Sequence, residues 1–159
     1  FPGGEIGHAC VEPEEPEACN CGNHGCLEQM ASATGIVRLA KRYLAEYKGK
    51  TVLNPSRISA KSVYDALKAG DEAAAAIVEQ VSDYLGNALA IFSCVVDPEV
   101  IVIGGGVSKA GQILIDNVKK YYQKYAFISC KDTPIVLAEL ENDAGIYGAA
   151  KLALDGQNL

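Results

Sequence analysis

The sequence has few basic residues and no long hydrophobic run. Fourteen Lys and Arg residues stand against twenty Asp and Glu residues, which gives a formal net charge of −6 over 159 residues. A nucleic-acid surface needs clustered basic side chains that neutralise phosphates, so this balance argues against a nucleic-acid partner. The longest apolar run, ALAIFSCVV at 88–96, is far shorter than the ~20 residues of a membrane-spanning helix. We therefore expect a globular protein that contacts neither nucleic acid nor membrane through this region.

The six cysteines do not form the evenly spread framework of a disulfide-stapled protein. Cys19, Cys21 and Cys26 are clustered, while the other three stand apart along the chain. Small secreted scaffolds distribute their cysteines and lack long helices, whereas several long helices are predicted here. Cys94, in IFSCVV, is expected to be a small buried apolar residue. Because no charged-then-apolar leader opens the chain either, we expect a reducing, cytoplasmic location.

The chain opens with FPGGEIGH, without Met, inside what reads as a glycine-containing loop. We therefore expect residues 1–159 to be part of a longer polypeptide whose upstream part is missing here.

Hydrophobic periodicity and helix-capping residues predict an α/β fold. The segment at 4–11 is expected to be a short strand or loop, and a helix is expected to start near Cys26. Further helices are predicted at about 33–47, 59–70, 71–96, 108–125 and 142–154. Buried strands are predicted at 100–103 and within 134–140. Strands that alternate with helices indicate a mostly parallel sheet. Ser108 is expected to cap the helix after the first strand, and the small residues of the last helix predict close packing.

The cysteine cluster, CNCGNHGC at 19–26, has the residue types of a zinc site. Zinc takes four tetrahedral ligands and accepts thiolate sulfur and imidazole nitrogen. The alternatives are weaker: a disulfide between cysteines two residues apart is strained, a Cys-x-x-Cys redox pair is absent, and three unrelated buried thiols within eight residues would be a coincidence. His24 lies inside the tight glycine turn, so His8, on the preceding segment, is the better fourth ligand. The predicted set is His8, Cys19, Cys21 and Cys26.

Two carboxylates flank this predicted zinc loop. Glu5 precedes His8 by three residues, and Glu28 follows Cys26 by two. A zinc-bound imidazole offers its other ring nitrogen outward, and carboxylates accept hydrogen bonds from vicinal hydroxyls. Glu5, His8 and Glu28 could thus form a polyol-binding edge. The alternative for Glu28 alone is an acidic residue that favours a helix N-terminus.

A glycine-rich turn, Gly104, Gly105 and Gly106, follows the first predicted strand. It matches neither Gly-x-Gly-x-x-Gly nor the P-loop, because no Gly-Lys-Ser/Thr follows. A tight strand-to-helix turn explains the glycines as well as a ligand does. Contact with an adenosine is the ligand role that such a turn beside a cleft would offer.

The motifs GGEIGH, CNCGNHGCLE, VIVIGGGVS and NDAGIYGAA, in this order, resemble the ROK family of repressors, open reading frames and sugar kinases. The resemblance covers nearly the whole chain. It implies the larger, C-terminal lobe of an actin-like, ribonuclease H-like ATPase with a zinc-binding loop at 8–26, the N-terminal lobe being absent from this chain. It also implies a homodimeric enzyme that uses ATP and Mg²⁺ to phosphorylate glucose or a related hexose.

The resemblance also assigns roles to residues. It implies a structural Zn²⁺ on His8, Cys19, Cys21 and Cys26, sugar contacts from Glu5, His8 and Glu28, and nucleotide contacts from Gly104, Gly105 and Gly106. The family's Asp-x-Gly-Gly-Thr phosphate loop and the aspartate that serves as general base are missing from this sequence. No catalytic residue is therefore expected within the chain, which alone should be inactive. A ROK repressor that senses sugar, a kinase for another hexose and a purely structural zinc module stay open as alternatives.

Overall fold

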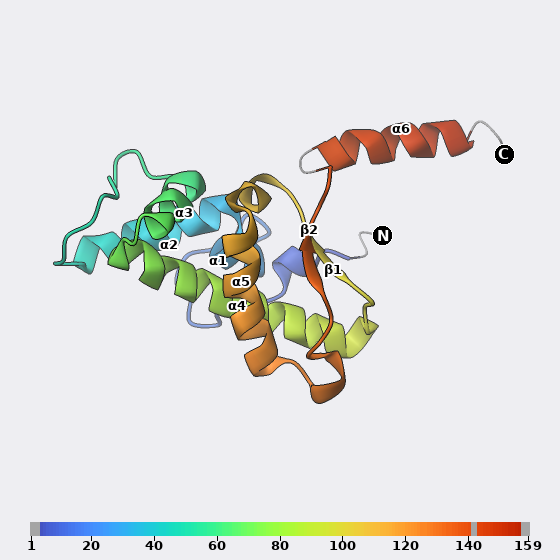
Figure 1. Cartoon of the computed structure of the whole chain (residues 1–159), viewed down its shortest axis with the longest axis horizontal. Coiled ribbons are helices and arrows are strands. Elements are labelled where there is room, and N and C mark those ends of the chain that lie inside the picture. The colour runs from blue at the N-terminus through green and yellow to red at the C-terminus, as the bar shows by residue number, and fades with distance from the viewer. Residues whose placement is uncertain (1–3, 141–142, 157–159) are drawn as a thin grey trace.

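A computed structural model describes residues 4–140 and 143–156 and shows a mixed α/β protein (Figure 1). Residue 142, where the last helix was predicted to begin, lies outside the described residues. In chain order the elements are η1 (Ile6–His8), α1 (Leu27–Ala31), α2 (Ala33–Glu46), α3 (Ala60–Lys68), α4 (Glu72–Val96), β1 (Ile101–Ile103), η2 (Gly106–Ala110), α5 (Gln112–Tyr125), η3 (Ile128–Cys130), β2 (Ile135–Leu137) and α6 (Ala144–Gly156).

The helices begin and end at residues whose side chains favour those positions. Ser32 caps α2 by accepting a hydrogen bond from the amide of Gly35 at 3.1 Å. Asp71 caps α4 in the same way, with its carboxylate 2.9 Å from the amide of Ala74. These contacts satisfy amides that have no partner within the helix. The helix boundaries predicted from the sequence for 33–47, 59–70 and 71–96 are confirmed to within one or two residues.

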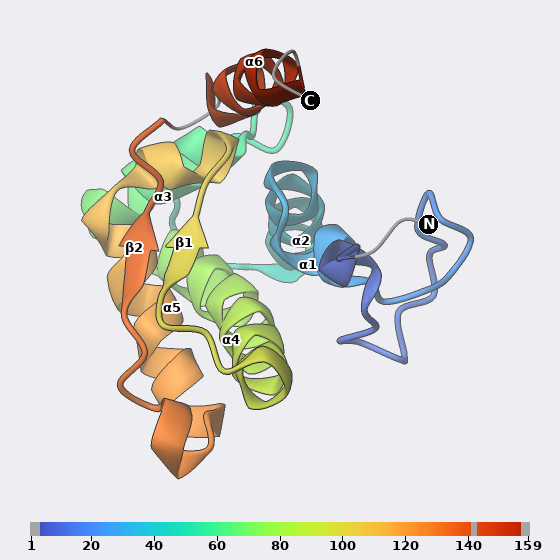
Figure 2. The same ribbon diagram turned by 90° about the vertical axis from the view of Figure 1, so that its right-hand side faces the viewer.

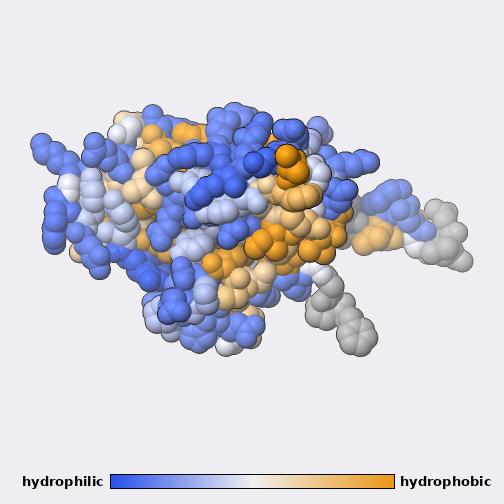
Figure 3. All heavy atoms as spheres, turned by 90° about the horizontal axis from the view of Figure 1, so that it is seen from below, coloured by the Kyte–Doolittle hydropathy of each residue, from blue (hydrophilic) through white to orange (hydrophobic). Residues whose placement is uncertain are grey.

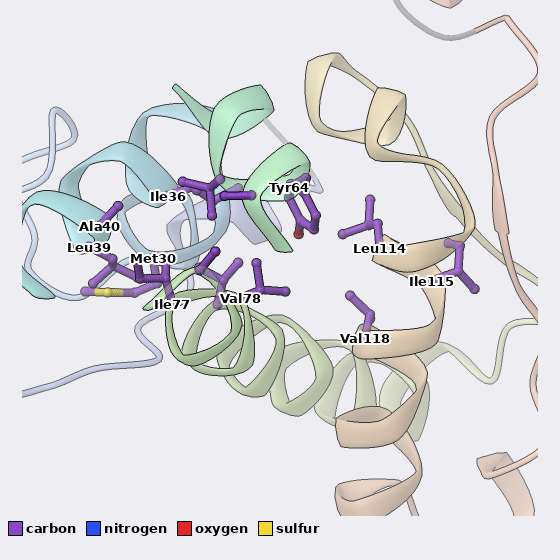
Figure 4. Packing of buried hydrophobic residues seen from close by; sticks show 14 of the residues in the cluster. Met30, Ile36, Leu39, Ala40, Tyr64, Ile77, Val78, Leu114, Ile115 and Val118 are labelled. Atoms are coloured by element: carbon purple, nitrogen blue, oxygen red, sulfur yellow. The ribbon is translucent and has the colours of Figure 1, made fainter. Parts of the chain in front are cut away.

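The hydrophobic core lies around α4, which packs against α1, α2, α3 and α5. Figure 4 shows its side chains converging from these helices, with Met30 and Ile36 on one side and Leu114 and Val118 on the other. Gly86 lets α4 and α5 approach closely, since a Cβ there would lie 2.6 Å from the backbone nitrogen of Tyr122. A close helix pair of this kind depends on the missing side chain.

β1 and β2 form a two-stranded parallel sheet in which Ile101 pairs with Ile135. The prediction of two buried strands is half right. Ile101 and Ile103 pack against the core, but Val102 on the other face is 57% exposed and Val136 is 41% exposed. Side chains alternate between the two faces of a strand, so only one face of the described sheet is covered.

The segment at 4–11, predicted to be a short strand or loop, is a loop with a 3-10 turn at Ile6–His8. Three smaller predictions are corrected. Ser108 does not cap α5; its hydroxyl donates a hydrogen bond to the carbonyl of Gly105 at 2.7 Å, and α5 starts after Gly111. Cys94 is exposed. The last helix, α6, has no buried residue, so its small side chains do not pack closely within the described chain. None of the helices in residues 4–140 and 143–156 combines the length and hydrophobicity of a membrane span.

Candidate metal centre and the adjoining edge

The loop from His8 to Cys26 is held in shape by backbone contacts. Its two ends are joined where Leu27 donates to the carbonyl of Ala9 at 2.9 Å and Val11 donates to that of Gly25 at 2.7 Å. Gly25 has a φ of +67°, and a Cβ there would overlap the carbonyl of Glu12. Only glycine tolerates both conditions at low energy. Gly25 of the cysteine motif is thus required by the way the loop closes on itself.

This closure brings the four predicted metal ligands together. The ligand atoms of His8, Cys19, Cys21 and Cys26 all lie within 4.8 Å of one another. The Cys19 sulfur is 3.8 Å from His8 Nδ1, and the Cys21 and Cys26 sulfurs are 3.6 Å apart. Ligand atoms that each lie about 2.0–2.3 Å from a tetrahedral zinc are separated from one another by distances similar to these. The cluster therefore has the composition and the size of a closed four-ligand zinc site.

The protonation chemistry of the cluster also suits a cation. Burial raises the pKa of the Cys26 thiol to about 12, next to the sulfurs of Cys21 and Cys19. A backbone hydrogen bond at Asn23 lowers the pKa of Cys21, which lies at the exposed side of the loop. A buried thiol of high pKa becomes a thiolate when a metal ion stabilises the negative charge. These residues could hold a metal such as zinc, which would neutralise the sulfurs that the loop crowds together.

His24 is not a member of the cluster. Its ring nitrogen Nδ1 lies 3.0 Å from the backbone carbonyl of Glu15, and its side chain is exposed. The structure thus brings His8, and not His24, together with the three cysteines.

The two nitrogens of His8 face different neighbours. Nδ1 faces Cys19, whereas Nε2 lies 3.7 Å from a carboxylate oxygen of Glu28. Glu28 sits in the first turn of α1, the helix that starts directly after its N-cap residue Cys26. The His8 and Glu28 side chains are 33% and 46% exposed, so both remain open to a ligand. Imidazole and carboxylate thus form one polar edge beside the cluster.

Glu5 stands at the start of η1, three residues before His8. Its side chain is exposed, and its backbone carbonyl accepts a hydrogen bond from the amide of His8 at 3.1 Å. Among the described residues, no hydrogen bond or ion pair joins its carboxylate to His8 or Glu28. The structure therefore brings His8 and Glu28 side by side and leaves Glu5 nearby along the chain.

One set of contacts at this site, those of Glu15, was not predicted from the sequence. Glu15, in the acidic connector EPEEPEA, is buried and forms ion pairs with Arg38 at 2.9 Å and Arg42 at 2.7 Å. Burial alone would raise the pKa of Glu15, but hydrogen bonds from Arg42 and Arg38 hold it below its ordinary value. The two arginines are four residues apart on α2, hence on one face of that helix. That spacing was the available signal for a buried acidic partner.

Gln29 and Arg38 extend this anchor to α1. The Gln29 side chain accepts from the amide of Cys26 at 3.1 Å and donates to the carbonyl of Glu17 at 3.0 Å. Arg38 donates to the carbonyl of Gln29 at 3.1 Å. These side-chain hydrogen bonds therefore tie the loop from His8 to Cys26 to the two helices that follow it.

The glycine-rich turn lies at the other end of α1. Gly104 and Gly106 line a hollow of about 320 Å³ whose opposite wall includes Ala31, the last residue of α1. A neighbouring hollow of about 130 Å³ lies between Gly106 and α3. Gly105 has a φ of +79°, which accounts for one of the three glycines by conformation alone. Because α1 has only five residues at 1.5 Å rise each, the His8–Glu28 edge and the turn lie close to opposite ends of one short helix.

Comparison with known proteins places this arrangement in a family. The model of the ROK family matches residues 2–156. The glucokinase of Halalkalibacterium halodurans is 42% identical over 98% of this chain and 48% of its own length, and that of Thermotoga maritima is 39% identical over 94% of this chain and 49% of its own. An N-acetylglucosamine repressor of Escherichia coli O157:H7 is 32% identical over 90% of this chain and 35% of its own length.

A solved structure agrees with the sequence relatives. The ROK family glucokinase from Streptomyces griseus, in complex with glucose and AMPPNP, superposes with a TM-score of 0.81 at 29% identity, covering 93% of this chain and 50% of that one. The chain spans about half the length of the curated glucokinases that it matches, and it corresponds to their C-terminal portion. The mixed α/β architecture is that of a lobe of the actin-like ATPase fold. The chain belongs to the ROK family.

Proposed function

We propose that the chain is the C-terminal half of an ATP-dependent glucokinase and supplies its zinc loop and its sugar-facing edge. The observation that carries this proposal is the orientation of His8 within the cluster, with Nδ1 toward Cys19 and Nε2 toward Glu28. The proposal is also supported by the 42% and 39% identity of this chain to two bacterial glucokinases over almost the whole length of the chain.

Zinc on His8, Cys19, Cys21 and Cys26 would be structural. Four protein ligands leave no position for a reactive water, so the ion would hold the loop and polarise nothing. It would also fix the His8 ring, whose Nε2–H would donate a hydrogen bond to a sugar hydroxyl. The Glu28 carboxylate, 3.7 Å away, would accept from an adjacent hydroxyl. A rigid donor and acceptor at this spacing suit vicinal hydroxyls, and Glu5 would complete the edge from the start of η1.

The nucleotide would occupy the other end of α1. The Gly104–Gly106 turn and the hollows beside it present glycine backbone and apolar walls to an adenosine. Phosphoryl transfer depends on holding the γ-phosphate, Mg²⁺ and the attacking hydroxyl in line. Neither the phosphate loop nor the general-base aspartate of the family is present in this sequence, so we assign no catalytic residue here. The complete enzyme would work in the cytoplasm, where free thiols persist, as a homodimer.

A ROK repressor is the second candidate. The observation in its favour is the match to an N-acetylglucosamine repressor over 90% of this chain. The sugar edge would then act as a sensor, and an upstream segment would bind DNA. A kinase for another hexose is a variant of the first proposal.

One experiment on the complete protein separates these functions. Purified protein is given glucose, fructose, mannose or N-acetylglucosamine with Mg²⁺ and ATP, ADP release is followed by a coupled assay, and zinc is measured in the same sample. The proposal expects one zinc per chain and the highest kcat/KM with glucose. A zinc-containing protein that releases no ADP with any sugar, yet binds DNA in a sugar-dependent way, would refute the kinase and establish the repressor.

A further inference from the structure

A fourth cysteine lies beside the metal cluster without belonging to it. Cys10 stands outside the CNCGNHGC motif, yet the closure of the loop places it opposite Cys26 in an antiparallel pair. Its side chain is exposed, and its sulfur is not one of the four ligand atoms that converge. Figure 2 shows the loop projecting beside α1, on the side away from β2. The loop therefore carries one exposed thiol that the metal site does not use.

The backbone holds Cys10 and Cys26 in register. The amide of the residue after each cysteine donates to the carbonyl of the residue before the other, at 2.9 and 2.7 Å. Two bonds that flank a pair in this way define directly opposed residues whose Cα atoms lie about 4.5 Å apart and whose side chains leave the same face. Disulfides span Cα separations of about 4.4–6.8 Å. The backbone spacing of the pair therefore suits a disulfide, and the two sulfurs need only side-chain rotation to meet.

We propose that Cys10 and Cys26 are a site of reversible thiol oxidation, at which a peroxide forms a disulfide that withdraws Cys26 from the metal cluster. Cys10 meets the oxidant because it is exposed, whereas Cys26 is 0% exposed and reacts only within the protein. Cys21 is exposed as well, but a metal ion in the cluster would engage its sulfur and leave that of Cys10 free. The release of metal rests on the proposed zinc site, while the disulfide itself does not.

The oxidation takes place in two balanced steps. The Cys10 sulfur attacks one peroxide oxygen, so that an S–O bond forms, the O–O bond breaks and water leaves a sulfenic acid on Cys10. The Cys26 sulfur then attacks the Cys10 sulfur, so that the S–S bond forms, the S–O bond breaks and a second water leaves. The two sulfurs lose two electrons, which the peroxide gains. The thiol protons end in the two waters, and where a metal holds Cys26 as a thiolate, solvent supplies the second proton.

The disulfide acts on both sides of the His8–Glu28 edge. Cys26 is the N-cap residue of α1, which carries Glu28 in its first turn, and Cys10 follows His8 by two residues. Without the Cys26 thiolate only three ligands remain in the cluster, and a structural zinc site needs four. The ring of His8 then loses the ion that would fix it. Oxidation should therefore release the metal and loosen the edge together.

Peroxide treatment of the complete protein tests the proposal. Hydrogen peroxide is added, zinc release is followed with a chromophoric chelator, and disulfides are mapped by mass spectrometry of non-reduced peptides. The proposal expects a Cys10–Cys26 disulfide, zinc release with the same time course, and reversal of both by dithiothreitol and added zinc. A disulfide between Cys21 and Cys26 while Cys10 stays reduced, or zinc release that precedes any change at Cys10, would overturn it.

A pair of matched variants shows whether Cys10 is the thiol that matters. Cys94 is the other exposed cysteine outside the cluster, and it lies in the last turn of α4. That end of α4 is at the bottom of Figure 1, and hydrophobic side chains gather on this face in Figure 3, so a change there leaves the loop untouched. Peroxide should release zinc about tenfold or more slowly from Cys10→Ser, which lacks the first sulfur of the disulfide, and at the wild-type rate from Cys94→Ser. Equal rates in Cys10→Ser and wild type would contradict the proposal.

The same measurements separate this inference from the proposed function. A protein that holds no zinc and still forms the Cys10–Cys26 disulfide would refute the proposed metal site and support the oxidation site. A zinc-containing glucose kinase in which peroxide leaves Cys10 reduced would refute the oxidation site and leave the proposed function intact.

Discussion

The ion pairs of the buried Glu15 with Arg38 and Arg42 should control how easily the loop from His8 to Cys26 opens. In Glu15→Gln the side chain keeps its shape but loses its charge, so Arg38 and Arg42 lose their shared carboxylate at 2.9 and 2.7 Å. A hydrogen bond between charged groups contributes about 1.5–3 kcal/mol. The Arg42 side chain is 49% exposed and can return to solvent, so its contact with Glu15 contributes much less stability than that of Arg38, which is only 20% exposed. We expect the free energy of loop opening to fall by about 2–3 kcal/mol, which makes opening roughly 30- to 150-fold more frequent.

The assay is amide exchange at Val11 and Leu27, whose amides close the two ends of the loop. Glu14→Gln is the matched control, because Glu14 is an exposed neighbour in the same acidic connector. Exchange at both amides should accelerate in Glu15→Gln and stay unchanged in Glu14→Gln. A change of less than about threefold in Glu15→Gln, or an equal change in both variants, would refute the claim that this ion pair holds the loop.

The same comparison has a defined pH dependence. The pKa of Glu15 in the folded chain is depressed by its arginine partners. Its stabilisation is therefore fully present above the ordinary Glu pKa of about 4.3 and is lost as the pH falls through the depressed folded value. The ratio of exchange rates between Glu15→Gln and wild type should be constant from pH 7 to about 5 and shrink toward one in stronger acid. A ratio that grew on acidification would contradict the sign of the shift.

Three further predictions concern packing, sugar recognition and catalysis. Gly86→Ala should lower the free energy of unfolding by about 1–3 kcal/mol in urea denaturation, because its Cβ would meet the α5 backbone. The control Gly145→Ala should leave the free energy of unfolding unchanged, because its Cβ would meet nothing within 4 Å. Equal effects of the two variants would argue against a close α4–α5 contact. In the complete enzyme that we propose, Glu28→Gln should raise KM for glucose about tenfold or more, since one charge-assisted hydrogen bond is lost, while the zinc content stays at one per chain; normal glucose kinetics would exclude Glu28 from the proposed sugar site. The purified 159-residue chain should release no ADP with glucose and ATP in a coupled assay, and turnover that survives removal of contaminating kinases would show that the missing segments are dispensable.

Local signals in the sequence predicted most of the helical fold. Periodic apolar residues and capping side chains such as Ser32 and Asp71 act within a few residues of one another, so no tertiary information is needed to interpret them. Burial was harder to predict. Cys94 and the last helix carry the apolar and small residues typical of a core, yet both are exposed. Whether such a residue is buried depends on what packs against it, and the sequence of one segment does not contain that information.

The candidate metal centre was also predicted only in part. Spacing and ligand chemistry predicted His8 and the three cysteines, because a metal site restricts both residue type and geometry. No role was predicted for Glu15, although the arginines on α2 could have indicated its partner. The prediction for Ser108 was wrong because a 3-10 turn separates the strand from α5, and hydroxyls in such turns can donate to the preceding backbone. The missed partners of Glu15 are a contact between distant segments, whereas the error at Ser108 is local.

The placement of the cluster suggests why one lobe serves both kinases and regulators in this family. The His8–Glu28 edge lies within residues 8–28 and is held by contacts to α1 and α2. Phosphoryl transfer, by contrast, needs a base and a phosphate loop that this sequence lacks. If the His8–Glu28 edge recognises a sugar, as proposed above, that recognition can persist while the upstream segment changes from one that positions ATP to one that binds DNA. The proposed function then makes the segment that precedes η1 the part that separates a kinase from a regulator.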